Sequence, residues 1–410
     1  MSHIFVFVTG LLLVFSVHAD QNLCTYTPSE VASKPKQEKY PNLRTENLSA
    51  SQVYTQKLYI RMTGVTPNIG NLKFGRMVKL VQQNKIDDAL KMMMAEDGFL
   101  QVRIRNFAAP FSSKDYSTLE PLNDLQALII GIIRDDLDAR LILTGDIRYS
   151  GTEKYGLPEI SMKNNDHYVA FESANLSFSS DLKKYDQQWP NFDEAAGALT
   201  TRAWAKINFD MGTNRRNVPN SFNVFLCSHI DSWKTRGVPD VYVRRDVTRN
   251  NAGDPAVYQN FCRNCHGLMD GMGGAFAKFD FTDGSIQFKK NGVMEKMNQH
   301  AEVYPEGYVT TDDSWENMLH YNPSISFGWR SPMKGQGIKQ FAEMLAQSKA
   351  YSQCLVKKVY QEICGTSILE TAPELLEPLR TKFESNGYKI RSLISNIAVE
   401  RQCISPEGVL

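Results

Sequence analysis

The strongest constraint in this sequence is a C-x-x-C-H pentad that runs from Cys262 to His266. Such a pentad is typical of the attachment site of a c-type haem. The two cysteine thiols add across the vinyl groups of the porphyrin, and the adjoining histidine binds the iron from one side. We therefore predict one haem c per chain, held covalently by Cys262 and Cys265, with His266 as the proximal iron ligand.

A lone C-x-x-C also occurs in redox dithiols, in disulfides and in halves of zinc sites, which are the alternatives to haem attachment. A second C-x-x-C is absent from the sequence, which removes the usual four-ligand zinc pattern. The residues around the pentad do not predict the βαβ unit of a thioredoxin either. Haem attachment is the interpretation that these observations favour.

The N-terminus has the pattern of an export signal. Residues 4–17 form an almost unbroken apolar run, and Val17 and Ala19 suit cleavage after Ala19. The run is shorter than the ~20 residues of a membrane-spanning helix, although residues 1–19 lack the usual Lys or Arg. We predict a signal peptide over residues 1–19 and a periplasmic or extracellular mature protein that does not span a membrane.

The overall charge gives no indication of a nucleic-acid partner. The formal net charge is +1, and a hydrophobic fraction of 42% is that of ordinary packed cores. Two basic clusters, Asn214-Arg215-Arg216 and Arg244-Arg245-Asp246, contain too few charges to change this. We interpret both as solvated faces or ion pairs.

Five cysteines remain outside the pentad: Cys24, Cys227, Cys354, Cys364 and Cys403. In an oxidising compartment this number suggests two disulfides and one free thiol. If Cys354 and Cys364 share a helix, their Cα atoms lie about 15 Å apart, beyond the ~7 Å that a disulfide spans. Cross-pairs with Cys227 and Cys403 are therefore expected, and the sequence does not choose among them.

Apolar residues spaced three and four apart predict a mainly α-helical chain in which strands are scarce. Gly271, Gly273 and Gly274 predict a turn behind the pentad that lets the backbone pass the porphyrin edge. Helical stretches are expected over residues 77–93, 122–143, 195–209, 258–267 and 340–363. The first leaves room for a break after Val81, and the last has one near Ser348. One or two further helices follow after residue 373 and are separated at Asn386-Gly387.

These patterns divide the chain into successive parts. The first 19 residues are the signal peptide, and the last part is a helical tail. Between them we expect an extended lead-in, a helical N-terminal module of unknown function and a cytochrome c-like haem module. The boundaries are 20–50 for the lead-in, 51–250 for the helical module, 251–365 for the haem module and 366–410 for the tail.

The haem segment has a distinctive continuation. The pentad is followed by Leu268-Met269-Asp270, then by Gly274-Ala275-Phe276 and by Phe279-Asp280. In this order the residues resemble the haem-binding cytochromes of planctomycete type, which are large exported bacterial proteins with several domains of unknown function. Weaker similarity covers most of the mature chain, with departures at Gly271 and after Gly365. The resemblance implies an exported c-type cytochrome and adds no substrate.

The function depends on the ligand on the other side of the iron. Methionine would give an electron-transfer site of raised potential, histidine a lower potential, and no ligand an open site. Met333 is our first candidate, because Pro and Gly shape residues 331–337 as a loop. Met318 and His320 are the second choice, and His300 is the third.

We expect one-electron transfer to an unidentified redox partner protein. One alternative is a peroxidase-like or oxidase-like haem enzyme whose substrate site lies in the N-terminal module. The other is a binding or scaffold protein in which haem is structural. The sequence assigns no catalytic residue, since no constellation of acid and base groups stands out.

Overall fold

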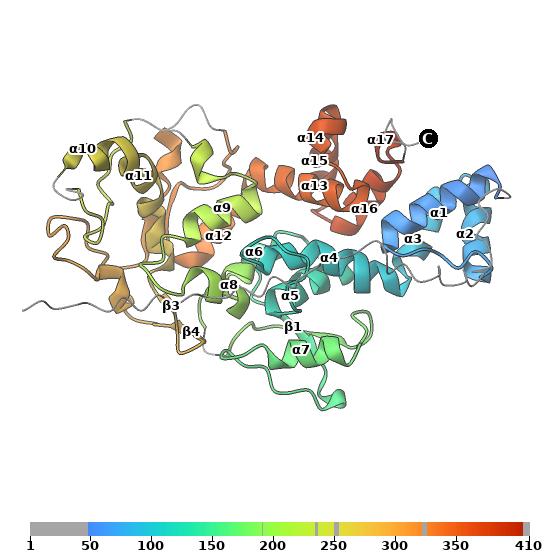
Figure 1. The fold of residues 1–410 in the computed structure, drawn as a ribbon, viewed down its shortest axis with the longest axis horizontal. Helices are drawn as coiled ribbons and strands as arrows, with labels where there is room; N and C mark the ends of the chain where they lie inside the picture. The colour runs from blue at the N-terminus through green and yellow to red at the C-terminus, as the bar shows by residue number, and fades with distance from the viewer. Residues whose placement is uncertain (1–47, 191, 234–236, 250–253, 322–325, 405–410) are drawn as a thin grey trace, which may run out of the picture. The chain divides into compact units, whose positions relative to one another are not determined.

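The computed structural model describes residues 48–404, apart from residues 191, 234–236, 250–253 and 322–325 (Figure 1). The predicted signal peptide, residues 20–47 of the lead-in and Cys24 lie outside the described residues. Contacts group Ser49–Leu410 into one unit. The finer division at residues 250 and 365 stays a prediction.

The described residues are mainly α-helical, as predicted, and their strands form three two-stranded antiparallel sheets. Strand β1 pairs with β2, β3 with β4, and β5 with β6. The strands are β1 Arg148–Gly151, β2 Leu182–Tyr185, β3 Phe279–Thr282, β4 Ser285–Phe288, β5 Ser314–Glu316 and β6 Lys334–Gln336. None of the helices among these residues combines the length and apolarity needed to cross a membrane.

The first three helices pack on one another: α1 (Ala50–Thr63), α2 (Leu72–Gln82) and α3 (Ile86–Met94). Ser49 caps α1, because its hydroxyl accepts a hydrogen bond from the backbone of Gln52. The predicted stretch over 77–93 breaks at Gln83–Lys85, and Asn84 there adopts a positive φ. The break therefore falls in the gap that the sequence left after Val81.

Helix α5 (Asp124–Arg134) is buried along almost its whole length and contacts α4 (Arg105–Ala108), α6 (Leu141–Thr144), α8 (Arg202–Asn208) and β1. The prediction of one helix over 122–143 is wrong. The chain leaves α5 after Arg134, Asp136 adopts a positive φ, and the Asp135 carboxylate accepts a hydrogen bond from the Tyr149 hydroxyl. The helix ends in a local turn, in which the backbone N–H of Leu137 donates to the Ile132 carbonyl at 2.9 Å and that of Asp136 donates to the Ile133 carbonyl at 3.2 Å. The apolar spacing alone would allow the helix to continue.

The remaining helices outside the pentad segment lie mostly in the second half of the chain. The break near Ser348 is confirmed, because the Ser348 hydroxyl caps α13 by accepting from the Tyr351 backbone. The separation at Asn386-Gly387 is also confirmed, whereas the predicted helix over 195–209 starts as a 3₁₀ turn at Gly197–Thr200. The helices are α7 Asp166–Ser173, α9 Asn217–Leu226, α12 Gly337–Gln347, α13 Lys349–Cys364, α14 Ile368–Thr371, α15 Leu376–Ser385, α16 Ile390–Ala398 and α17 Arg401–Ile404.

Two disulfides tie these helices together. Cys227, at the end of α9, bonds Cys354 with a Cα–Cα distance of 5.3 Å, and Cys364 bonds Cys403 at 4.9 Å. Cys354 and Cys364 share α13, as the sequence argument supposed. The expectation of cross-pairs with Cys227 and Cys403 is thus confirmed.

Candidate haem site

The pentad lies on one continuous helical segment. Helix α10 (Pro255–Val257) leads into the π-helical η8 (Tyr258–Cys262) and then into α11 (Arg263–Met272). The Asp254 carboxylate caps its start by accepting from the Ala256 backbone. In Figure 1, α10 and α11 lie side by side, coloured dark yellow. The helix runs past the predicted end at 267, so the turn expected at Gly271 is instead part of α11.

Cys262 and Cys265 are both partly exposed and both free. Three residues apart on a helix, they face the same side. Burial raises the pKa of the Cys265 thiol, and Asp231 and Cys262 raise it further. A redox dithiol needs the opposite shift. In the described part of the chain, no cluster of three His, Cys, Asp or Glu residues is arranged to hold a metal ion.

The His266 ring is oriented by a carboxylate one helical turn later. Its Nδ1 lies 3.2 Å from Oδ1 of Asp270, whose side chain is fully buried, whereas the His266 side chain is 20% exposed. A carboxylate at Nδ1 fixes the tautomer of a metal-binding histidine and raises its basicity. Because Nδ1 is engaged by Asp270, Nε2 is the nitrogen that would be available to an iron.

Asp270 is in turn held by two arginines. Arg215 donates through Nε to Oδ1 at 3.0 Å, and the Arg244 backbone N–H lies 3.4 Å from Oδ2. Burial alone would raise the pKa of Asp270, but His266, Arg215 and Arg244 together keep this pKa below its usual value. Arg215 also forms an ion pair with Asp246, with Nη1 2.6 Å from Oδ2. The carboxylate behind His266 is thus ionised and fixed.

Arg244 is also almost fully buried, with 1% exposure. Its Nη1 donates to the Thr213 carbonyl at 2.6 Å, and burial lowers the pKa of Arg244 to about 10. A solvated face is therefore the wrong interpretation of this cluster. The ion-pair interpretation is confirmed for Arg215 and Asp246.

The glycines after the pentad make room for other parts of the protein. A Cβ on Gly271 would lie 2.8 Å from the Glu316 carbonyl oxygen, and one on Gly273 would lie 2.7 Å from Nη2 of Arg244. Gly273 and Gly274 belong to the 3₁₀ turn η9 (Gly273–Phe276). These glycines let β5 and Arg244 approach the helical segment that carries the pentad, a role that the sequence did not reveal.

Gly274→Ala is expected to be the most disruptive of the glycine substitutions around α11. The added Cβ would lie 1.9 Å from the Ser314 carbonyl oxygen, which belongs to the backbone and has little freedom to move. We expect a loss of about 3 kcal/mol in the free energy of unfolding, measured by urea denaturation. Gly75→Ala is the control, because a Cβ on this helical residue meets nothing within 4 Å. That variant should be neutral or slightly stabilising, and equal stability of the two variants would contradict the packing argument.

The three preferred distal candidates lie close together along β5, β6 and the turn η11 (Met318–Tyr321), and β5 and η11 contact α11. Met318 is buried, and its Cγ would lie 3.0 Å from a Cβ on Gly271. His320 is exposed, with Nδ1 2.6 Å from the Asn317 carbonyl oxygen. Met333 is partly buried, and its carbonyl accepts from the Asn317 backbone at 2.7 Å.

The third choice, His300, is exposed and pairs with Glu302 at 3.3 Å. The choice among Met333, Met318 and His320 stays a prediction.

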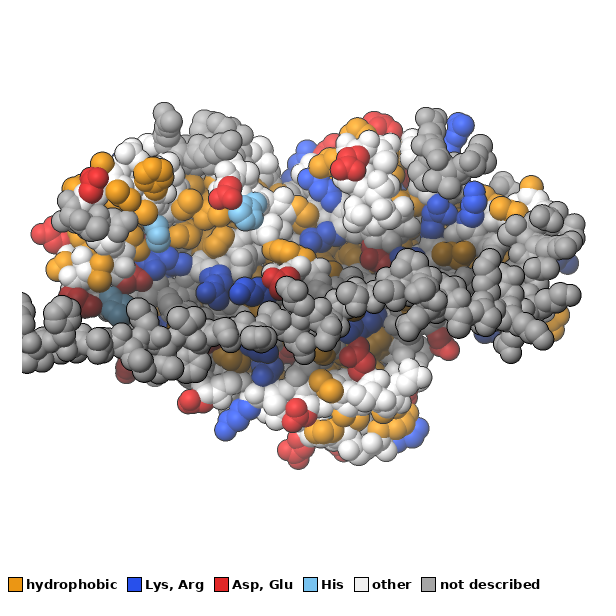
Figure 2. Space-filling model, viewed as in Figure 1, with side chains coloured by type: hydrophobic (Ala, Val, Ile, Leu, Met, Phe, Trp, Pro, Cys, Tyr) orange, Lys and Arg blue, Asp and Glu red, His pale blue; other side chains and the backbone are white. Residues whose placement is uncertain are grey.

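The surface beside the pentad is apolar. Figure 2 shows several apolar side chains at the surface over the part of the molecule that contains α10 and α11. Phe261, directly before the first cysteine of the pentad, is 75% exposed, and Val241 is also exposed. Exposed apolar side chains in one place usually mark a binding surface. A porphyrin is apolar over most of its area, so a haem attached here would cover exposed apolar side chains of this kind.

Part of this site was open to sequence analysis and part was not. Asp270 follows His266 by four residues, the spacing that brings two side chains together on a helix. Arg215, Arg244 and Asp246 lie far from the pentad in sequence, and no local pattern indicated that they support it.

Comparisons with known proteins give no information on this site. No family model matches the chain, and neither a curated protein nor a solved structure does. The resemblance to planctomycete-type cytochromes therefore rests on the quoted residues alone.

Proposed function

We propose that this protein is an exported c-type cytochrome that transfers one electron at a time through a single covalently attached haem. The observation that carries the proposal is that two free cysteines lie next to a histidine whose ring is already oriented. Cys262 and Cys265 are free on one side of a helix, whereas Cys227, Cys354, Cys364 and Cys403 form disulfides. The adjacent His266 is already oriented at Nδ1 by Asp270.

A bound haem c would supply an iron that alternates between the ferric and ferrous states. Cys262 and Cys265 would hold it by thioether bonds, and Nε2 of His266 would be the proximal ligand. Asp270 would keep the imidazole strongly electron-donating, because its carboxylate is buried and ionised. Met333 is the first choice for the distal ligand, with Met318 and His320 as the alternatives.

Two disulfides support a location outside the cytoplasm, since such bonds persist in oxidising compartments. The proposed location is the periplasm or the extracellular space. The partner would be another redox protein, and the exposed apolar surface at Phe261 is the natural place for its approach to the haem edge.

A haem enzyme is the second candidate, and one observation favours it. The buried carboxylate of Asp270 on Nδ1 of His266 makes the imidazole a strong donor to iron, which also suits an open site that activates a small molecule. A structural haem in a binding protein is the third possibility.

The test compares optical spectra of the mature protein, produced in a host that attaches c-type haem. Oxidised, reduced and carbon monoxide-treated samples are recorded for the unaltered protein and for Met333→Ala, Met318→Ala and His320→Ala. We expect a low-spin haem that binds carbon monoxide readily only when the distal ligand is removed, in one of the three variants. Ready binding of carbon monoxide by the unaltered protein would favour the enzyme, and absence of covalent haem would overturn both functions.

A further inference from the structure

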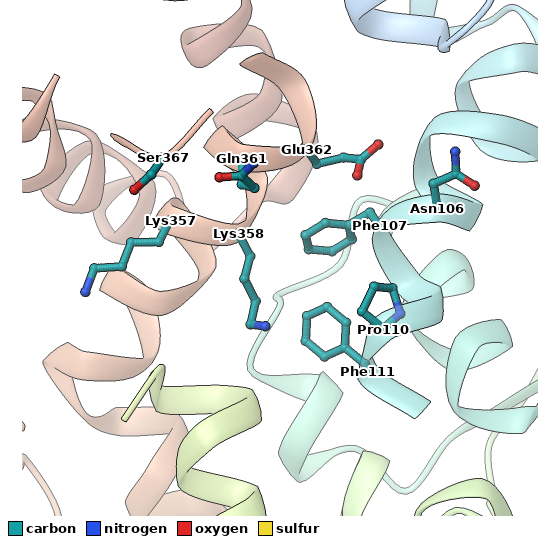
Figure 3. A pocket seen from close by; sticks show the side chains of 9 residues that line it. All are labelled: Asn106, Phe107, Pro110, Phe111, Lys357, Lys358, Gln361, Glu362 and Ser367. Atoms are coloured by element: carbon teal, nitrogen blue, oxygen red, sulfur yellow. The ribbon is translucent and has the colours of Figure 1, made fainter. Parts of the chain in front are cut away.

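A pocket of about 320 Å³ lies between α13 and the segment formed by α4 and the 3₁₀ turn η4 (Ala109–Ser112). One wall is apolar and consists of Phe107, Pro110 and Phe111 (Figure 3). The opposite wall belongs to α13 and carries Lys357 and Lys358. This volume is in the range of pockets that hold small organic molecules.

Lys358 does not pair with Glu362, the acidic residue one helical turn later. Glu362 lies four residues later, where it would ordinarily pair with a lysine on a helix. Its carboxylate instead accepts from Nη1 of Arg103 at 2.8 Å, and Figure 3 shows Glu362 pointing away from Lys358. Within the described part of the chain, neither Lys358 nor Lys357 has a hydrogen-bond acceptor or an acidic partner for its amine.

The remaining neighbour of Lys358 is an aromatic ring. The amine extends toward Phe111 and lies 5.0 Å from the centre of the ring. Such a contact stabilises an ammonium only in part. Burial accordingly lowers the pKa of Lys358 to about 8 and also lowers the pKa of Lys357. A half-buried ammonium without a counter-ion is costly, and an anion entering the pocket would relieve that cost.

We propose that this pocket binds a small aromatic carboxylate, with its ring on Phe107 and Phe111 and its carboxylate on the amine of Lys358. The apolar wall selects the aromatic part of the ligand, and the amine of Lys358 selects the negative charge; Figure 3 shows the amine of Lys357 pointing away from this wall. Because Glu362 is engaged by Arg103, it neither neutralises Lys358 nor repels the incoming anion. This inference is independent of the haem.

The test uses 1-naphthoate and its uncharged counterpart 1-naphthalenemethanol as probes. Binding of each to the full protein is measured by titration calorimetry at pH 7. We expect 1-naphthoate to bind at least ten times more tightly than the alcohol. Lys358→Gln should abolish this preference and Lys358→Arg should retain it. Lys382→Gln, which removes an exposed lysine of α15 outside the pocket, should change neither affinity.

The affinity for 1-naphthoate should also fall as the pH rises from 7 to 9.5. The carboxylate of the probe stays ionised throughout, whereas Lys358 loses its proton in this range. The other charged groups at the pocket are Lys357 on α13 and the Glu362–Arg103 pair; α4 and η4 contribute Asn106, Phe107, Pro110 and Phe111, which do not titrate.

Three results would overturn the proposal: equal affinities for the two probes, an affinity for 1-naphthoate that does not change with pH, or full affinity in Lys358→Gln. The thermal unfolding midpoint of each variant establishes that it is folded. If Lys358→Gln does not fold, the comparison of the two probes and the pH series on the unaltered protein still decide the question.

Discussion

Replacement of both Cys262 and Cys265 by Ala is expected to abolish covalent haem attachment. The two thiols are the only free cysteines in the described part of the chain, so no other described side chain has a thiol that could form a thioether bond with a haem vinyl group. The unaltered protein, separated under denaturing conditions after reduction of its disulfides, should retain haem absorbance on the polypeptide and show the matching increase in mass. The double variant should show neither, because His266 alone does not hold haem once the protein unfolds.

The matched control removes two other cysteines. Cys364→Ala with Cys403→Ala breaks a disulfide that joins the end of α13 to α17 and lies outside the haem segment. This variant should keep its covalent haem and lose about 2–4 kcal/mol of stability. Haem that remains on the polypeptide of the Cys262/Cys265 double variant after denaturation would contradict the assignment of the attachment site.

Local patterns predicted much of the helical framework. The break between α12 and α13 was visible at Ser348, whose hydroxyl caps the second helix, and the break after Val81 was visible as a gap in the apolar spacing. The disulfide pairing followed in part from geometry, because a shared helix separates Cys354 from Cys364. Both helix breaks depend on residues within a few positions of one another, whereas the disulfides join residues 127 and 39 positions apart, and the sequence did not choose between the possible pairs.

The prediction failed where a helix ended earlier than its apolar spacing suggested. The helix expected over 122–143 ends at Arg134 in a turn that places Asp136 at positive φ, and Asp135 in this turn accepts a hydrogen bond from Tyr149 on β1. The expectation that the glycines after the pentad let the backbone pass a porphyrin edge stays a prediction. What the sequence did not indicate is that Gly274 borders the backbone of Ser314 and Gly273 borders Arg244. Apolar spacing carries no information on such partners, because they come from other elements of the fold.

The same division applies to the candidate site. Cys262, Cys265 and His266 form a contiguous motif, so the sequence was sufficient to identify them. The support of His266 was not predicted, because Arg215 lies 55 residues before Asp270. The sequence of a basic cluster does not tell whether its side chains are exposed to solvent or buried as ion-pair partners. Only the fold shows that Arg244 is buried against Thr213.

Asp270→Ala is expected to destabilise the protein by about 3–5 kcal/mol, the usual result of removing one partner from a buried ion pair. The substitution leaves the guanidinium of Arg244 buried without its nearest carboxylate and leaves Arg215 with Asp246 alone. Urea denaturation of the haem-free protein measures this loss separately from any effect on haem. Unchanged stability would show that the network is not coupled to folding.

Asp270→Asn separates the electronic role of this residue from its structural role. The amide keeps a hydrogen-bond acceptor toward Nδ1 of His266 but loses the negative charge, and a charge-assisted hydrogen bond is roughly twice as strong as a neutral one. The imidazole then donates less to iron, so the ferric state loses stability relative to the ferrous state. For a difference of roughly 1 kcal/mol, the reduction potential of the haem-loaded variant should rise by about 40 mV.

Asp246→Asn is the matched control for the potential. Asp246 pairs with Arg215 and makes no contact with His266 among the described residues. Its loss should lower stability, because it too leaves a largely buried arginine with a weaker partner, yet it should shift the potential much less than Asp270→Asn. Equal shifts in the two variants would mean that the potential reports the summed charge of the network. A shift confined to Asp270→Asn would assign the effect to the carboxylate that contacts His266, because Asp246 makes no such contact among the described residues.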